Sequence, residues 1–364
     1  MKKVVLQCRS KAGGCSWVVA VLLAAMLGCG RPEPVRIGFV GGTSGRVADL
    51  GIAGRDAVYL AVERCNAEGG IKGRPLRLIV RDDEQDPGKA VQVVQELVDL
   101  GVAAIVGPMT SAVAVAVAPL ADAAGVVLMS PTVTTEKLSG KDDHFFRVSS
   151  TTREYATRSA RYHLKNVTMR RVAAAYDLGN HFYTENWLRN FQTAFREGGG
   201  EIVLEKTFVS GGDTDHLQLS RELLAAMPDG VLIIANSMDS AILCRQVRKL
   251  DPDIPITLAD WGATERLIEL GGRAVEGVTV VQTFDRDSPK PAYQAFRKLF
   301  MERFQKEPGF PGVYSYEAAG VVIEALRRQV PGQSLKEVLL AMDRFEGLQS
   351  PFRFDAFGDV QRPQ

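Results

Sequence analysis

From about residue 35 onward, the chain alternates short apolar runs with longer segments in which apolar residues recur at helical spacing. In Gly54–Asn66, for example, Val58, Val62 and Cys65 fall on one helical face, because residues three and four positions apart are neighbours on a helix. The same spacing predicts helices over Asn186–Glu197 and Ser240–Leu250.

The short apolar runs predict strands. Ala103–Val106 and Val126–Met129 are continuous apolar runs bounded by Gly and Pro, which is typical of strands covered on both faces of a parallel sheet. Asp86 followed by Pro87 predicts a helix N-cap between two of these strands. The other predicted strands are Val35–Gly41, Leu76–Val80, Arg171–Tyr176, Ile202–Phe208, Val231–Ala235, Ile256–Leu258 and Val278–Val281.

This alternation of strands and helices with short connections predicts the α/β class with parallel sheets. The strands form two groups, separated near Ser149–Arg153, so we expect two similar lobes. The length of 364 residues also suits two domains. Because no low-complexity linker separates the groups, tight crossings are expected between the lobes.

Composition removes several functional classes. Lys plus Arg number 44 and Asp plus Glu number 43, and this balance lacks the basic excess of a nucleic-acid-binding protein. Only four histidines are present, and they show no metal-ligand spacing. The acidic run Asp82–Asp86 is interpreted as a solvated strand end with a helix cap, and not as a cation site.

The N-terminus predicts export. Met1–Lys11 is basic, Cys15–Leu27 is an apolar run of about 13 residues, and small residues follow, so residues 1–28 are interpreted as a secretory signal peptide. Cys29 resembles the lipid-modified cysteine of a bacterial lipobox, although Met26 and Leu27 depart from the usual pattern. The alternative is ordinary signal cleavage nearby. No disulfide is expected between Cys65 and Cys244.

The chemistry is concentrated where the predicted strands end. In open α/β sheets, ligands bind beyond the carboxyl ends of the strands. Three such ends in the first lobe are rich in Gly, Ser and Thr, whose hydroxyl and backbone N–H groups suit an anion. Two ends in the second lobe carry Asp177 and Asp260. Donors on one wall and a carboxylate on the other predict a zwitterionic ligand. The first-lobe ends are Gly41–Gly45, Gly107–Ser111 and Ser130–Thr134.

Sequence motifs give no support for an enzyme. The chain has no G-x-x-x-x-G-K-[ST] or H-E-x-x-H, and Thr43 replaces serine at the centre of Gly41–Gly45. Taken alone, Ser111 and Thr134 also fit simple helix caps, and Asp260 fits a turn beside a packed Trp261. No cofactor is expected.

Several motifs resemble the family of periplasmic leucine/isoleucine/valine-binding proteins. They are Gly69–Leu76 followed by Arg81–Asp83, Gly107–Thr134 with its Ser130–Thr132, and Ser350–Asp355 through Asp359. The resemblance extends over nearly all of the chain after the signal segment. It implies a type I periplasmic binding protein with two Rossmann-like lobes and three hinge crossings. Lobe one is then residues 35–150 plus 285–343, and lobe two is residues 151–284 plus 344–364.

The resemblance also implies individual site residues. The position of Ser111 matches a serine that binds the ligand carboxylate, and Thr134 matches a threonine that binds both ends of an amino acid. The backbone carbonyl of Thr132 matches an acceptor for the ammonium group. Asp260 matches an acidic residue that completes the ammonium site, with one methylene fewer than the usual Glu.

Other positions depart from the family pattern. Leu50 and Asn236 stand where branched-chain receptors have Tyr, and Gln85 and Thr110 match the positions of a disulfide. His181, and Tyr183 as the second choice, match an aromatic residue that packs on the ligand. By the same resemblance, Met109 and Thr110 face the ligand side chain.

The resemblance therefore implies an extracytoplasmic solute-binding protein that delivers an amino acid to an ABC permease by closing two lobes around it. A sensory subunit for a signalling partner, and a ligand such as an amide, urea or an aromatic acid, are the open alternatives. Cys29 is expected to provide a membrane anchor.

Overall fold

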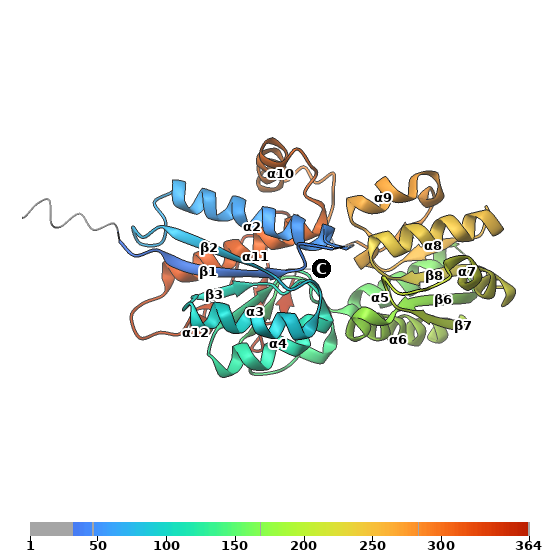
Figure 1. Cartoon of the computed structure of the whole chain (residues 1–364), viewed down its shortest axis with the longest axis horizontal. Coiled ribbons are helices and arrows are strands. Elements are labelled where there is room, and N and C mark those ends of the chain that lie inside the picture. Colours follow the sequence, from blue (N-terminus) through green and yellow to red (C-terminus); the bar gives the residue numbers. More distant parts are fainter. Residues whose placement is uncertain (1–31, 46, 168, 283, 363–364) are drawn as a thin grey trace, which may run out of the picture.

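The computed structural model describes residues 32–45, 47–167, 169–282 and 284–362. The predicted signal segment, residues 1–28, and Cys29 lie outside these ranges. The described residues form two α/β lobes, each built around a five-stranded parallel sheet (Figure 1). The α/β class, the parallel sheets and the two lobes predicted from the sequence are confirmed. None of the helices in these ranges combines the length and the apolar character needed to span a bilayer.

Lobe one contains the sheet with strand order β2-β1-β3-β4-β5. Helices α2 and α11 cover one face of this sheet, and α3 and α4 cover the other. The strands are β1 (Val35–Gly41), β2 (Leu76–Asp82), β3 (Ala104–Val106), β4 (Val127–Ser130) and β5 (Phe145–Arg147). The helices are α2 (Asp49–Ala67), α3 (Pro87–Asp99), α4 (Ser111–Ala123), α10 (Pro291–Phe304), α11 (Gly309–Arg328) and α12 (Leu335–Leu340).

Lobe two repeats this arrangement with strand order β10-β9-β8-β6-β7. Read from β7 to β10, the order along the chain is the same as in lobe one, so the two lobes share one topology. The strands are β6 (Arg171–Asp177), β7 (Glu201–Phe208), β8 (Gly230–Ile234), β9 (Ile256–Leu258) and β10 (Thr279–Val280). The helices are α5 (Thr152–Tyr162), α6 (His181–Glu197), α7 (His216–Ala225), α8 (Ser237–Leu250) and α9 (Glu265–Gly271).

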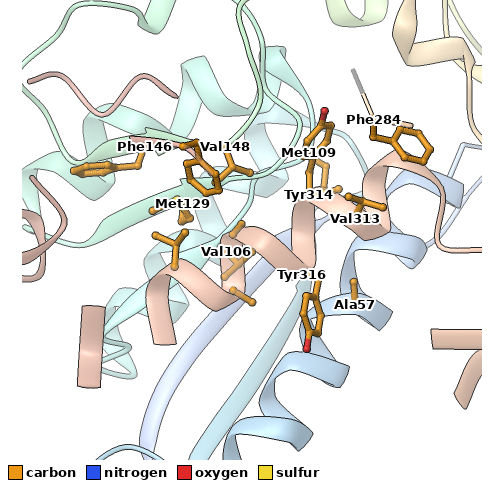
Figure 2. Packing of buried hydrophobic residues seen from close by; sticks show 14 of the residues in the cluster. Ala57, Val106, Met109, Met129, Phe146, Val148, Phe284, Val313, Tyr314 and Tyr316 are labelled. Atoms are coloured by element: carbon orange, nitrogen blue, oxygen red, sulfur yellow. The ribbon is translucent and has the colours of Figure 1, made fainter. Parts of the chain in front are cut away.

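Successive side chains along a strand point to opposite faces of the sheet and so fill two different hydrophobic cores. In β1, Ile37 and Phe39 point into the core under α2 and α11, whereas Val40 points into the core under α3 and α4. Figure 2 shows the first of these cores, where Val106 of β3 and Met129 of β4 lie beside α11. Such strands carry no polar face, and for this reason they appear as continuous apolar runs in the sequence.

The predicted strands are all present, with ends that differ by a few residues at most. Asp86 caps α3 as predicted, because its side chain accepts a hydrogen bond from Lys89 N at 2.6 Å and Pro87 occupies the first turn. The sequence did not reveal β5, which has only three residues and ends in the polar Arg147.

The C-terminal segment corrects one expected boundary. Strands β11 (Arg353–Phe354) and β12 (Val360–Gln361) form a small antiparallel sheet. Phe354 packs edge-on against Phe146, with ring centroids 5.3 Å apart. Arg147, which is fully buried, pairs with Asp359 at 2.6 Å. These contacts attach the segment to lobe one, so the assignment of residues 344–364 to lobe two is wrong for the described residues up to Arg362.

The pair between Arg147 and Asp359 generates a stability prediction. Asp359→Ala removes the partner of a guanidinium that is fully buried, and breaking such a pair typically costs about 3 kcal/mol. We expect a corresponding fall in the free energy of unfolding, measured by urea denaturation.

The matched control is Glu346→Ala. Its partner Arg344 is 62% exposed and Glu346 itself is 75% exposed, so the loss should stay below about 1 kcal/mol. Equal effects of the two substitutions would show that Asp359 does not anchor the segment.

Candidate functional site

The strand ends of the two lobes meet at a cleft. Two adjoining pockets occupy it and share Thr132, Asp260 and Phe310 in their linings. Each pocket has a volume of about 20 Å³, which is enough for about one water molecule, so a larger ligand fits here only when the lobes stand further apart. Lobe one contributes Leu50, Met109, Thr110, Ser111, Thr132 and Thr134; lobe two contributes Asn180, Tyr183, Asp260 and Trp261; and the crossings and their neighbours contribute Ser149, Tyr155, Gln282, Phe310 and Tyr314.

Direct hydrogen bonds hold the lobes together around the cleft. The carboxylate of Asp49, at the start of α2, accepts hydrogen bonds from Ser237 Oγ at 2.6 Å and from Thr264 Oγ1. At a second point, Ala112 N of α4 donates to Asn180 Oδ1 at 2.9 Å. Because each bond joins one lobe to the other, the structure represents the closed form of the protein.

Asp260 is the centre of the lobe-two wall. It lies two residues beyond the end of β9, in a single turn that spans Asp260–Gly262. Its Oδ1 accepts hydrogen bonds from Tyr183 OH at 2.7 Å and from Trp187 Nε1 at 3.0 Å. Tyr183 OH in turn accepts from Trp261 N at 3.2 Å, so α6 and the turn after β9 hold the carboxylate in one orientation.

Burial raises the pKa of Asp260 to about 6, because the charged form loses water, while the hydrogen bonds from Tyr183 and Trp187 pull the pKa back down. No Lys, Arg or His side chain belongs to the lining of the two pockets in the described part of the chain. The cleft therefore contains a carboxylate whose charge no neighbouring lining residue balances.

The lobe-one wall offers hydroxyl groups. Thr132 Oγ1 donates to Met109 O at 2.6 Å, and Thr134 Oγ1 accepts from Thr152 Oγ1 at 2.9 Å. Ser111 is the first residue of α4, and its hydroxyl has no hydrogen-bond partner among the described residues. Thr110, the N-cap of α4, lines the same wall and its hydroxyl likewise has no partner among the described residues, so these two hydroxyls are available to a ligand.

An apolar wall completes the cleft. Leu50 and Met109 are buried, and Trp261 packs edge-on against Tyr183, with ring centroids 5.7 Å apart. Figure 2 shows Met109 and Tyr314 at the end of α11 that lies nearest Phe284. Such a surface suits an apolar ligand side chain.

The structure brings most of the predicted site residues together. Those that line the cleft are Leu50, Met109, Thr110, Ser111, Thr132, Thr134, Tyr183 and Asp260.

Asn236 and His181 do not belong to the cleft lining. Asn236 caps α8, where its Oδ1 accepts from Asp239 N at 3.0 Å and its Nδ2 donates to Asp239 Oδ2 at 2.6 Å. His181 begins α6 and packs against Phe182, with ring centroids 4.1 Å apart. Of the two aromatic candidates in this loop, Tyr183 is the one at the cleft.

Sequence reasoning missed several lining residues. Tyr155 and Tyr314 come from helices, and Ser149 and Gln282 come from the crossings, so no strand end pointed to them. Asn180 lies between Asp177 and His181, which the sequence analysis named, but the helix was predicted to begin only at Asn186 and no motif pointed to Asn180. In the described ranges, no cluster of three His, Cys, Asp or Glu side chains has an arrangement suited to a metal ion.

Comparison with known proteins gives consistent matches. The model of the family described as "Periplasmic binding protein" matches residues 34–363. The leucine-specific-binding protein of Salmonella typhimurium is 25% identical over 334 residues, which cover 90% of this chain and 89% of that protein.

Solved structures with the same fold include two with different ligands. The branched-chain amino acid transporter substrate-binding protein LivJ of Streptococcus pneumoniae, in complex with isoleucine, has a TM-score of 0.81 at 24% identity, covering 91% of this chain and 100% of that chain. A solute-binding protein of an ABC transporter from R. palustris, in complex with benzoate, has a TM-score of 0.82 at 20% identity, covering 91% of both chains. At these identities the two structures establish the likeness of the fold.

The raised pKa of Asp260 predicts how stability depends on pH. The folded pKa of about 6 exceeds the value of about 3.9 for an unfolded chain, so the folded state binds a proton more tightly between these values. This contribution is fully present below about pH 4 and is lost as the pH rises through about 6, with an upper limit of about 3 kcal/mol.

In ligand-free protein, we therefore expect Asp260→Asn to gain stability relative to the wild type as the pH rises from about 4 to about 7. Asp83, whose pKa burial also raises to about 6, is present in both proteins, so the difference isolates Asp260. Melting temperatures across this pH range measure the effect, and parallel curves for the two proteins would contradict it.

Proposed function

Because this chain belongs to the periplasmic binding protein family, as its motifs predicted, we propose that it is an extracytoplasmic solute-binding protein that closes its two lobes on a zwitterionic amino acid. The observation that carries this proposal is the chemistry of the cleft: one buried carboxylate, Asp260, faces neutral donors on the other lobe, and no basic side chain lines the space between them.

The ammonium group of the ligand is the partner that Asp260 requires. Oδ1 already accepts hydrogen bonds from Tyr183 and Trp187, while Oδ2 has no partner among the described residues. A charge-assisted hydrogen bond from an ammonium group to this carboxylate is stronger than a neutral one. Thr132 lines both pockets while its side chain donates to Met109 O, and its backbone carbonyl is the proposed second acceptor for the ammonium group.

The carboxylate of the ligand meets neutral donors. Ser111 Oγ, at the first residue of α4, a helix of 13 residues, lines the pocket that also contains Asp260, and at the same helix end Ala112 N already donates to Asn180 Oδ1. A helix N-terminus attracts an anion through its unpaired N–H groups and its dipole. A ligand carboxylate therefore does not need a basic residue here.

The apolar wall supports an amino acid with a hydrophobic side chain. Leu50, Met109 and Trp261 are nearly devoid of exposed surface and lie in the pocket that contains Ser111. Relatives named for binding leucine, isoleucine and valine are consistent with this choice. An aromatic acid, as in the benzoate complex of a structural relative, is the second candidate, but it lacks an ammonium group for Asp260.

The transport role follows from the family. We propose that closure about the crossings near 150/151 and 284/285 presents the loaded protein to an ABC permease in the inner membrane, and that no bond of the ligand is made or broken. A ligand that binds the closed cleft more tightly than the open one shifts the population further toward the closed form. The alternative is a sensory role with the same binding step. The identity of the membrane partner, a permease or a signalling protein, distinguishes the two roles.

Binding by the Asp260→Asn variant tests the proposal. We expect its dissociation constant for a hydrophobic amino acid to rise by more than about tenfold, because the ammonium group loses its charged partner. The wild-type affinity should also fall about tenfold from pH 8 to pH 5, since Asp260 is then mostly protonated, and the variant should lack this dependence. Isothermal titration calorimetry measures both effects.

The matched control is Glu276→Gln, which removes an exposed carboxylate from lobe two outside the cleft. It should leave the dissociation constant unchanged at each pH. An Asp260→Asn variant that binds amino acids as tightly as the wild type would remove Asp260 from the ligand site.

Export and anchoring form a separate proposal that rests on the N-terminal sequence. We expect Cys29→Ser to move the protein from the membrane fraction to the soluble fraction, because the acyl chains have no other attachment point in the lipobox-like motif. Fractionation followed by immunoblotting measures the distribution. A variant that stays with the membrane, or a wild type that is never there, would exclude the anchor.

A further inference from the structure

Asn180 occupies a helix N-cap position without capping its helix. It precedes α6 with φ −124° and ψ 46°, which are non-helical values, and its side chain makes no capping hydrogen bond. Asparagine is among the preferred N-cap residues because its side-chain oxygen normally accepts from an N–H of its own helix. The side chain of Asn180 is therefore used for something else.

The side chain crosses from lobe two to lobe one. Asn180 Oδ1 accepts a hydrogen bond from Ala112 N at 2.9 Å, and Ala112 is the second residue of α4, next to Ser111. Only 5% of Asn180 is exposed. The residue is thus enclosed in the closed protein at the point where the ligand carboxylate is proposed to bind.

This hydrogen bond fixes which end of the amide faces the cleft. A backbone N–H can only donate, so the atom opposite Ala112 N must be the amide oxygen. The Nδ2 group then points away from that bond, and it donates to no described residue. Asn180 lines the same pocket as Ser111 and Asp260, so its two N–H donors are available to a ligand there.

A rigid turn supports this orientation. Asp177 Oδ1 accepts hydrogen bonds from Gly179 N and from Ser210 N, both at 2.9 Å. Asp177 O accepts from Thr184 Oγ1 at 2.7 Å, which ties the turn to the first turn of α6. Asn180 is therefore held in place before the ligand arrives, and little conformational freedom is lost on binding.

We propose that Asn180 is a ligand-binding and specificity-determining residue whose Nδ2 donates to the ligand carboxylate from lobe two. This inference rests on the proposed amino-acid function and extends it. The carboxylate would then be bound by both lobes, through Ser111 and α4 on one side and Asn180 on the other. Ligands without a carboxylate lose this second contribution to closure, so the protein selects amino acids over the corresponding amines.

The Asn180→Asp substitution separates the two ends of the amide. It keeps an oxygen acceptor for Ala112 N but replaces the Nδ2 donors with a negatively charged oxygen. The probes are the amino acid with the lowest wild-type dissociation constant among leucine, isoleucine, valine and phenylalanine, and the amine obtained by removing its carboxylate. Calorimetric titrations at about pH 8 measure both.

We expect the dissociation constant for the amino acid to rise at least about tenfold, since two carboxylates then face each other, while the amine binds as well as or better than it binds the wild type. Asn166→Asp, which adds the same charge at an exposed position of lobe two, is the control and should change neither value. Melting temperatures of the ligand-free variants establish that they fold.

If Asn180 serves only as a tie between the lobes, Asn180→Asp leaves the amino-acid affinity within about twofold, and Asn180→Ala weakens the amino acid and the amine by the same factor. That result overturns the inference about Asn180. The proposed function still holds in that case, provided that the wild type binds an amino acid. A wild-type protein that binds none of the four amino acids overturns both.

Discussion

A carboxylate enclosed between two lobes without a basic neighbour is the constraint on which this site depends. Asp260 is positioned by Tyr183 and Trp187, whose donated hydrogen bonds offset part of the loss of water around the charge. Those hydrogen bonds do not neutralise the charge of Asp260. None of the described residues that line the cleft is Lys, Arg or His. A cationic group on the ligand pairs with this carboxylate and so removes the destabilisation that an unpaired buried charge causes.

The two sheets explain why this chemistry gathers at one place. Both sheets have the same strand order, in which successive strands are added first on one side of the first strand and then on the other. The loops after β3 in lobe one and after β6 in lobe two lie at this point of reversal, where ligands of open α/β sheets bind. Ser111 follows β3 and Thr134 follows β4 in lobe one, whereas Asn180 follows β6 and Asp260 follows β9 in lobe two. The hydroxyl groups of Ser111 and Thr134 and the carboxylate of Asp260 are thus carried by different lobes, and a ligand that binds both draws the lobes together.

The sequence predicted much of this arrangement because strand ends are visible in it. Apolar runs located the strands and the polar segments that follow them, and the resemblance to the leucine/isoleucine/valine-binding family then implied Ser111, Thr134 and Asp260, which the structure places at the cleft. The remainder depends on contacts between distant segments. Asn180 precedes α6, which begins five residues before the predicted helix start at Asn186, and Tyr314 lies in the second turn of α11. The C-terminal segment joins lobe one through Arg147, whose burial no local pattern revealed.

The central claim is that the cleft selects a ligand carrying both an ammonium and a carboxylate group. The direct measurement is a thermal-shift comparison on protein that has been unfolded and refolded to remove carried-over ligand, using leucine, 4-methylpentanoate and benzoate at equal concentrations. The account predicts stabilisation by leucine, about 2.7 kcal/mol at 100 times its dissociation constant, and none by the two acids that lack an ammonium group. Stabilisation by benzoate or 4-methylpentanoate that equals or exceeds the stabilisation by leucine would contradict it.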